Sequence, residues 1–224
     1  SISGRFVDQL VDQVNAAEPD LIVLAGDLVD GTVPQLSAEL TSLSRLEARY
    51  GVVLTTGNHE FYGGDVDRWM RWWRDQGIIV LDNSGIQLTE RGVSIDILGI
   101  HDTSGTGRHE PDLRAAAESL AASFGTPVDG AGRFRLLIAH EPRQALAEID
   151  PPVQFGVDVM LSGHTHGGQL WPFDYAVPLQ QPVVDGIHEL QGVTVVTSTG
   201  VGAWGPPVRV LAQPEVVMVT LQPA

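Results

Sequence analysis

The chain has 224 residues, of which 43% are hydrophobic and 18% charged, and its formal net charge at pH 7 is -15. This length and composition are those of one globular domain with a full core, so we expect residues 1–224 to form a single domain. The acidic balance argues against nucleic-acid binding through a basic surface. The absence of cysteine excludes disulfides, thiolate nucleophiles and cysteine-ligated zinc, and it suits an oxidising compartment as well as the cytosol.

No apolar run approaches the ~20 residues that a membrane-spanning helix needs. No signal peptide opens the chain, and neither an internal repeat nor a low-complexity linker interrupts it. We therefore expect a soluble domain.

Helical and strand patterns alternate along the first half of the sequence. The predicted elements there are a helix over 5–15, a strand over 21–27, a helix over 35–50, a strand and turn over 51–60, and a helix over 65–77. The last of these helices carries Trp69, Trp72 and Trp73, which we interpret as core residues rather than as a ligand-binding box.

Strands dominate the second half. Its predicted elements are strands near 78–81, 86–89 and 93–99, helices over 111–124 and near 142–149, and strands over 134–140, 157–164, 193–198 and 215–221. Together the two halves predict one α/β domain of layered sheets covered by helices.

Four separate predicted strands end in residues that can bind a metal. The strand "LIVLAG" ends in Asp27, "VVLTTG" in Asn58 and His59, "RLLIA" in His140, and "VMLSG" in His164 and His166. Ligands of open α/β sheets sit beyond the carboxyl ends of the strands, so we expect these side chains to share one rim. Carboxylate, amide and imidazole donors together suit a hard-to-borderline divalent cation.

The stretch "LSGHTHGGQL" strengthens this interpretation. A single histidine there would more often be an ordinary hydrogen-bonded loop residue. Two histidines at positions i and i+2 of an extended or turning backbone can project the same way, so His164 and His166 can reach one locus. The neighbouring glycines, Gly163, Gly167 and Gly168, allow a tight turn close to a ligand.

Other polar residues carry weaker signals. His101 follows a predicted strand, and we favour a plain loop role for it over a place on the same rim. We assign His109 and His188 to the surface and Asp30 to a turn or helix entry. Arg209 is a candidate phosphate contact, with an exposed salt bridge as the alternative.

The motifs "GDLVDG", "GNHE", "AHEP" and "GHTHGGQ", in this order, resemble those of the calcineurin-like metallophosphoesterase family, from about residue 5 to the C-terminus. The stretches "GGQLWPFDYAV" and "GVGAWGPPVR" resemble, more narrowly, the C-terminal catalytic domain of bacterial integral-membrane members. The resemblance implies a four-layer α/β/β/α sandwich and a metal-dependent phosphoric ester hydrolase. It also implies two divalent ions (manganese, iron or zinc), a phosphate-ester substrate and a membrane-anchored parent protein.

The resemblance also implies a role for each predicted metal ligand. Asp27 bridges the two metals, and Asn58, His140 and His164 complete one site. His166 serves the other site.

Two residues of the "GNHE" motif are implied to act on the substrate. His59 faces the phosphate and assists the leaving group, and Glu60 orients His59 or packs behind it. Two cations about 3.5–4 Å apart stabilise an in-line displacement at phosphorus, and such a cation lowers the pKa of bound water to about 7. A histidine outside the ligand set can then protonate the leaving oxygen.

One family motif is absent from this sequence. Members carry Asp-x-His on a first strand, whereas this chain opens at "SISGRF" and has that spacing nowhere. Without it, one site keeps Asp27 and His166 only, so we expect a sheet lacking its first strand and at most one tightly held ion in this chain. The alternative function is therefore a metal-binding or interaction domain with impaired or no catalysis. A monoester, a diester, a nucleotide and a lipid-linked phosphate all stay open as substrates.

Overall fold

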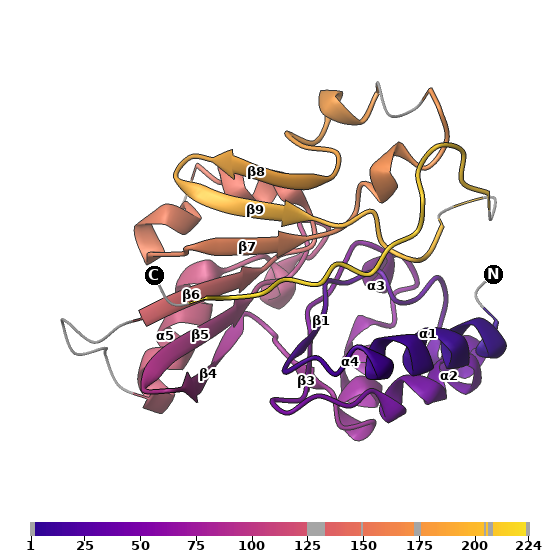
Figure 1. Ribbon diagram of the computed structural model, residues 1–224, viewed down its shortest axis with the longest axis horizontal. Helices are drawn as coiled ribbons and strands as arrows, with labels where there is room; N and C mark the ends of the chain where they lie inside the picture. Colours follow the sequence, from indigo (N-terminus) through magenta and orange to yellow (C-terminus); the bar gives the residue numbers. More distant parts are fainter. Residues whose placement is uncertain are drawn as a thin grey trace.

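Two β-sheets lie face to face, and helices cover the outer side of each (Figure 1). The computed structural model describes residues 3–124, 133–148, 150–172, 176–203, 205 and 208–222. The smaller sheet and its helices come from the first 80 residues, and the larger sheet from the rest of the chain.

The smaller sheet is parallel and has the strand order β1-β2-β3, so β1 lies at one edge. Its strands are β1 (Ile22–Leu24), β2 (Val52–Leu54) and β3 (Ile79–Val80), and its helices are α1 (Gly4–Ala16), α2 (Val33–Leu40), α3 (His59–Tyr62) and α4 (Val66–Asp75). Helix α1 begins where the Ser3 side chain caps the amide of Phe6. Helix α4 buries Trp69, Met70 and Trp73 against the sheet, which confirms the predicted core role of the tryptophans.

The larger sheet has the order β4-β5-β6-β7-β9-β8. Its strands are β4 (Ser84–Glu90), β5 (Val93–Gly99), β6 (Arg133–Ile138), β7 (Val159–Ser162), β8 (Gly186–Leu190) and β9 (Val193–Thr197). The four central strands are mutually parallel, while β4 and β8 pair antiparallel at the two edges. Helix α5 (Leu113–Phe124) packs on the outer face of this sheet through Leu113, Ala116 and Leu120.

Three separate apolar clusters hold the four layers together, because alternate residues of a strand face opposite sides. Val52 and Leu54 face α1 and α4, while Val53 between them faces the larger sheet. In the same way, Leu136 and Ile138 face the smaller sheet and Leu137 faces the outer helix layer. The predicted α/β/β/α arrangement is thereby confirmed. The expected gap for a further strand beside β1 stays a prediction.

Two predicted helices are wrong in part. The helix over 35–50 ends at Leu40 and continues only as a 3₁₀ turn over Thr41–Arg45. Hydroxyl groups bond to the local backbone there, from Thr41 to the Ser37 carbonyl and from Ser44 to the Thr41 carbonyl, and such bonds compete with a regular helix. The helix near 142–149 is likewise only a 3₁₀ turn, Pro142–Leu146.

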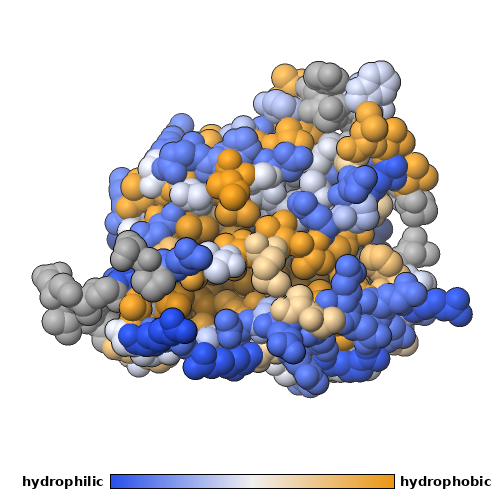
Figure 2. Space-filling view, in the orientation of Figure 1, coloured by the Kyte–Doolittle hydropathy of each residue, from blue (hydrophilic) through white to orange (hydrophobic). Residues whose placement is uncertain are grey.

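The C-terminal segment 215–221 was predicted as a strand, and this is wrong in the structure. It crosses the face shown in Figure 1 as an extended tail, and no strand ladder of the described residues includes it. Its apolar side chains are exposed: Val216, Val217, Met218, Val219 and Leu221. Figure 2 shows apolar residues gathered across the middle of this face. A pattern of β-formers specifies a strand only where a neighbour can pair with it.

Strand β8 was missed for the opposite reason. Residues Gly186–Leu190 are mostly exposed, so they lack the apolar alternation that predicts a half-buried strand. They become a strand because they pair along their whole length with β9.

The core between the larger sheet and α5 offers a test of this layering. Leu137 is fully buried there, so Leu137→Ala should lower the free energy of unfolding by about 2–5 kcal/mol through lost contacts and a residual cavity. Leu179, which is 86% exposed, provides the matched control, and Leu179→Ala should change stability little. Urea denaturation measures both variants. Equal effects would show that Leu137 does not face a packed layer.

Candidate metal centre

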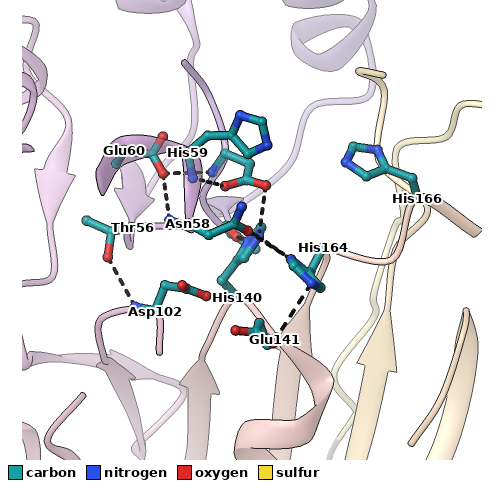
Figure 3. A network of polar contacts seen from close by, with 12 residues as sticks. Thr56, Asn58, His59, Glu60, Asp102, His140, Glu141, His164 and His166 are labelled. Atoms are coloured by element: carbon teal, nitrogen blue, oxygen red, sulfur yellow. Dashed lines mark hydrogen bonds and ion pairs between the residues drawn. The ribbon is translucent and has the colours of Figure 1, made fainter. Parts of the chain in front are cut away.

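Four predicted metal ligands meet where strands from both sheets end (Figure 3). The His140 Nε2 atom lies 3.0 Å from Asp27 Oδ2 and 3.2 Å from Asn58 Oδ1. The His164 Nδ1 atom lies 2.9 Å from Asn58 Oδ1 and 3.2 Å from His140 Nε2. Asp27 and Asn58 follow β1 and β2 of the smaller sheet, whereas His140 and His164 follow β6 and β7 of the larger one. The centre therefore joins the two sheets.

These four donor atoms fit a small divalent cation. Ligands about 2.0–2.2 Å from a tetrahedral ion lie a little over 3 Å from one another, which is close to the spacing here. The Nδ1 atom of His140 lies 2.6 Å from the Ala25 carbonyl, a contact that leaves Nε2 facing the other donors. His164 is oriented in the same sense, with Nδ1 toward the cluster and Nε2 3.9 Å from a Glu141 carboxylate oxygen.

The loops after β1 and β2 approach so closely that only glycine fits between them. A Cβ atom at Gly57 would lie 2.2 Å from Asp27 Oδ1, and one at Gly26 would lie 2.3 Å from the Gly57 nitrogen. Glu60 holds the two loops together. Its buried carboxylate accepts hydrogen bonds from the amides of Asp27, Leu28 and Gly57. The hydrogen bonds of Glu60 thus go to backbone groups, and both roles predicted for it, orienting His59 and packing behind it, stay predictions.

The Asp27–His140 pair dominates the electrostatics of the centre. Burial opposes the charge on each residue, but the hydrogen bond and charge of the partner outweigh it, which lowers the pKa of Asp27 to about 2 and raises that of His140 to about 9. Burial and the neighbouring His140 lower the pKa of His164. Burial and the Asp27 charge raise the pKa of Glu60. The centre thus brings carboxylates and imidazoles together where they are largely shielded from solvent, an environment that suits a cation site.

Three of the predicted ligands have a left-handed backbone that is rare for residues other than glycine. The φ angles are 57° at Asp27, 67° at His164 and 50° at His166. Such conformations are strained and persist where surrounding contacts enforce them, which is common at functional sites.

His166 stands apart from the other predicted ligands (Figure 3). The described residues that group around one possible cation here are Asp27, His140 and His164, without His166. The His166 ring lies 3.3 Å from Arg209, and burial together with the Arg209 charge lowers the pKa of His166 to about 4. Arg209 itself donates to the carbonyls of Thr199, Gly200 and His166. These bonds differ from the exposed salt bridge predicted as one alternative for Arg209, and its predicted phosphate contact stays a prediction.

His59 and Asp30 form a pair at the edge of the centre. The backbone amide of His59 donates to Asp27 Oδ1, and its ring Nδ1 lies 3.2 Å from Asp30 Oδ1. The ring is partly exposed, as a group that meets a substrate must be. Asp30, which we assigned to a turn or helix entry, lies three residues after Asp27, and its contact with this ring was not predicted from the sequence.

Two further acidic residues near the centre, Asp102 and Glu141, were not predicted from the sequence. Asp102 is buried next to the cluster, and its Oδ2 has no hydrogen-bond partner among the described residues. Burial raises the pKa of Asp102. Glu141 is held by Thr103, Arg143 and Gln181. Each directly follows a strand-end histidine, so the strand-end signal that identified His140 was present for both.

Comparisons with known proteins define the class. The sequence model of the calcineurin-like phosphoesterase family matches residues 5–168. An uncharacterized metallophosphoesterase of Campylobacter jejuni is 35% identical over 227 residues, covering 99% of this chain and 56% of that protein. A bovine transmembrane protein with a metallophosphoesterase domain is 30% identical over 236 residues, covering 100% and 50%. The chain spans about half the length of the curated relatives it matches.

Solved structures agree on the fold. A 5'-nucleotidase precursor from Thermus thermophilus superposes with a TM-score of 0.51 at 19% identity, covering 86% of this chain and 42% of that one. The sulfate thiohydrolase SoxB of the same genus gives a TM-score of 0.50 at 14% identity, covering 87% and 36%.

The fold and the motif order thus define a domain of the metallophosphoesterase class. The chain belongs to the calcineurin-like phosphoesterase family. Within the described ranges, no helix is both long and apolar enough to cross a bilayer.

Gly57 tests the loop geometry that orients Asp27. Gly57→Ala should displace the Asp27 loop, because the added Cβ has no room, and should lower the free energy of unfolding by about 1–3 kcal/mol. Gly202→Ala is the matched control, since a Cβ there meets nothing within 4 Å. Urea denaturation in the presence of a chelator compares the two. A Gly57→Ala variant as stable as the control would contradict the close approach of the loops.

Proposed function

We propose that this domain hydrolyses a phosphate ester at a dinuclear metal centre. Asp27, Asn58, His140 and His164 would hold one divalent cation, and Asp27 with His166 would contribute to the second. One observation carries the proposal: four donor atoms from two sheets form a cluster in which neighbouring atoms lie 2.9 to 3.2 Å apart, in the N/O set that divalent cations prefer.

The residues around the centre have separable tasks. A divalent cation, when bound, would stabilise phosphoryl charge and lower the pKa of the attacking water. Asp27 presents Oδ2 to the centre because Oδ1 is held by the His59 amide. Glu60 keeps the loop of Asp27 in place, and Ala25 sets the orientation of His140. These contacts preorganise the donors and reduce the reorganisation on metal binding.

His59 is the proposed proton donor to the leaving oxygen. Its Nδ1 bonds to Asp30, so Nε2 is the nitrogen that would meet a substrate. The contact with the carboxylate of Asp30 would fix the orientation of the ring. No described contact of His59 requires its ring as a metal ligand.

One observation favours the second candidate function, a metal-binding domain with weak or no turnover. His166 bonds to Arg209 and lies outside the group that surrounds the first cation. With Asp27 and His166 alone, the second site of this chain would have too few donors to hold an ion tightly. A lone cation can polarise the phosphate but cannot also hold the attacking water opposite the leaving oxygen.

The parent protein is proposed to be membrane-anchored. A bovine and a zebrafish relative are named as transmembrane proteins with a metallophosphoesterase domain, and this chain aligns with about half of each. The substrate proposed is a phosphate ester; the net charge of -15 disfavours a polyanionic nucleic acid bound through a basic surface.

Removal of His140 tests the first cation site. The chain should retain one manganese ion after dialysis, and His140→Ala should lose it, because three remaining ligands hold such an ion poorly. Elemental analysis gives the metal content, and hydrolysis of an aryl phosphate gives the rate, which should fall with it. His188, an exposed histidine, provides the control His188→Ala. Unchanged manganese in His140→Ala would overturn the assignment.

The role of His59 is tested in a longer chain that carries an upstream Asp-x-His motif. His59→Gln should keep its manganese and lose about 10²–10⁴-fold in kcat, the usual contribution of a general acid. Asp30→Asn should lower kcat less, since it removes only the carboxylate charge beside the ring and keeps an oxygen for its N–H. If His59→Gln loses a metal ion instead, the residue is a ligand and the proposed role is wrong.

A further inference from the structure

A second cluster of potential metal donors lies outside the centre already described. It consists of Asp82, His101 and His109, whose donor atoms all lie within 4.8 Å of one another. Asp82 follows β3, His101 follows β5, and His109 ends the 3₁₀ turn Gly107–His109. The surface position that the sequence suggested for His109 is wrong: it is 8% exposed, and His101 is fully buried beside it.

The histidine pair of this cluster has nearly the geometry of the pair in the metal centre. The His101 and His109 rings are perpendicular with centroids 4.9 Å apart, and His140 and His164 give 82° and 5.0 Å. In both pairs an Nε2 atom approaches the Nδ1 atom of the partner, at 3.3 Å and 3.2 Å.

A carboxylate completes each pair in the same way. Asp82 Oδ1 lies 2.7 Å from His101 Nε2, as Asp27 Oδ2 lies 3.0 Å from His140 Nε2. The cluster therefore places two imidazole nitrogens and one carboxylate oxygen within 4.8 Å of one another, close enough to bind one tetrahedral ion.

The outward nitrogens of both rings also have partners. His101 Nδ1 lies 2.9 Å from the Thr56 hydroxyl, and His109 Nε2 lies 3.1 Å from Asp67 Oδ1. A hydroxyl oxygen and a carboxylate can both accept an N–H, which would leave the inward nitrogens as lone pairs. Metal-binding histidines commonly have such outer partners, because these fix the tautomer and the ring orientation.

The two histidines of the cluster are buried, but solvent can reach the cluster past Asp82. The His101 and His109 rings are 0% and 10% exposed, whereas the Asp82 side chain is 35% exposed and opens the cluster to solvent. Phe61 lies against both rings, at 6.0 Å and 5.9 Å between centroids, and gives one side of the cluster an apolar wall. A cation could enter past Asp82 and take solvent as a fourth ligand.

We propose that Asp82, His101 and His109 form a further divalent-cation site of the zinc class, separate from the Asp27 centre. Two imidazoles and one carboxylate suit borderline ions, and such a set binds zinc more tightly than manganese. The site joins the end of β3 in the smaller sheet to the end of β5 in the larger one. A bound ion thus crosslinks the two sheets beside Thr56, two residues before Asn58.

The test counts zinc and manganese separately. The unaltered chain should bind two zinc ions but one manganese ion. His109→Gln should bind one zinc ion and still one manganese ion, which distinguishes this site from the Asp27 centre. The exposed His188→Gln provides the control and should bind both metals as the unaltered chain does.

A second experiment uses a chain that lacks two ligands of the Asp27 centre, so that its result does not depend on the proposed function. The double variant His140→Ala/His164→Ala, shown to be folded by circular dichroism, should retain one zinc ion and melt at a higher temperature with zinc than with a chelator. Adding Asp82→Asn should weaken zinc binding at least ~100-fold, since even outer partners of a ligand contribute 10–100-fold. Asparagine keeps an oxygen for the His101 N–H, so a purely hydrogen-bonded cluster would tolerate it. A folded double variant without zinc, or unchanged affinity in Asp82→Asn, would overturn the proposal.

Discussion

The buried carboxylate of Glu60 holds the geometry on which the rest of the centre depends. It accepts hydrogen bonds from three backbone amides of the loops after β1 and β2, and a buried charge requires such partners. These bonds bring the loops into contact at Gly26 and Gly57 and so fix the direction of Asp27. Asp27 in turn pairs with His140 from the other sheet. Through Asp27, the side chain of Glu60 on α3 thereby helps to hold the strand ends of the two sheets together.

Without a cation, the same arrangement lowers the stability of the folded chain. Two carboxylates, Asp27 and Glu60, are buried close together, and the loops contain strained left-handed residues such as Asp27 and His164. The ion pair between Asp27 and His140 compensates in part, as their opposed pKa shifts indicate. A divalent cation would offset more of this cost, because its charge would be attracted to Asp27 directly and to Glu60 at longer range. Stability and metal content of this domain are therefore coupled.

The sequence predicted those features that depend on local patterns and failed where tertiary contacts decide. Short apolar runs ending in Asp, Asn or His identified the strands and the four residues that converge, since strand ends share an edge. The tail over 215–221 was wrongly predicted as a strand, and β8 was not predicted. Both errors arise because strand pairing depends on a neighbouring strand rather than on propensity. The Arg209 contact of His166 could not be foreseen, since it joins residues 43 positions apart and Arg209 lies outside any predicted helix or strand.

The centre joins parts of the chain that are remote in sequence. His140 bonds to Ala25 across 115 residues, and His164 bonds to Asn58 across 106. Closing such long loops is slow and entropically unfavourable, so the donors come together only when both sheets have formed and docked. During folding, no assembled site is present for an ion to bind. Metal contacts would thus be absent from the early transition state and would act mainly by slowing unfolding. A bound ion would stabilise the finished fold rather than guide the chain toward it.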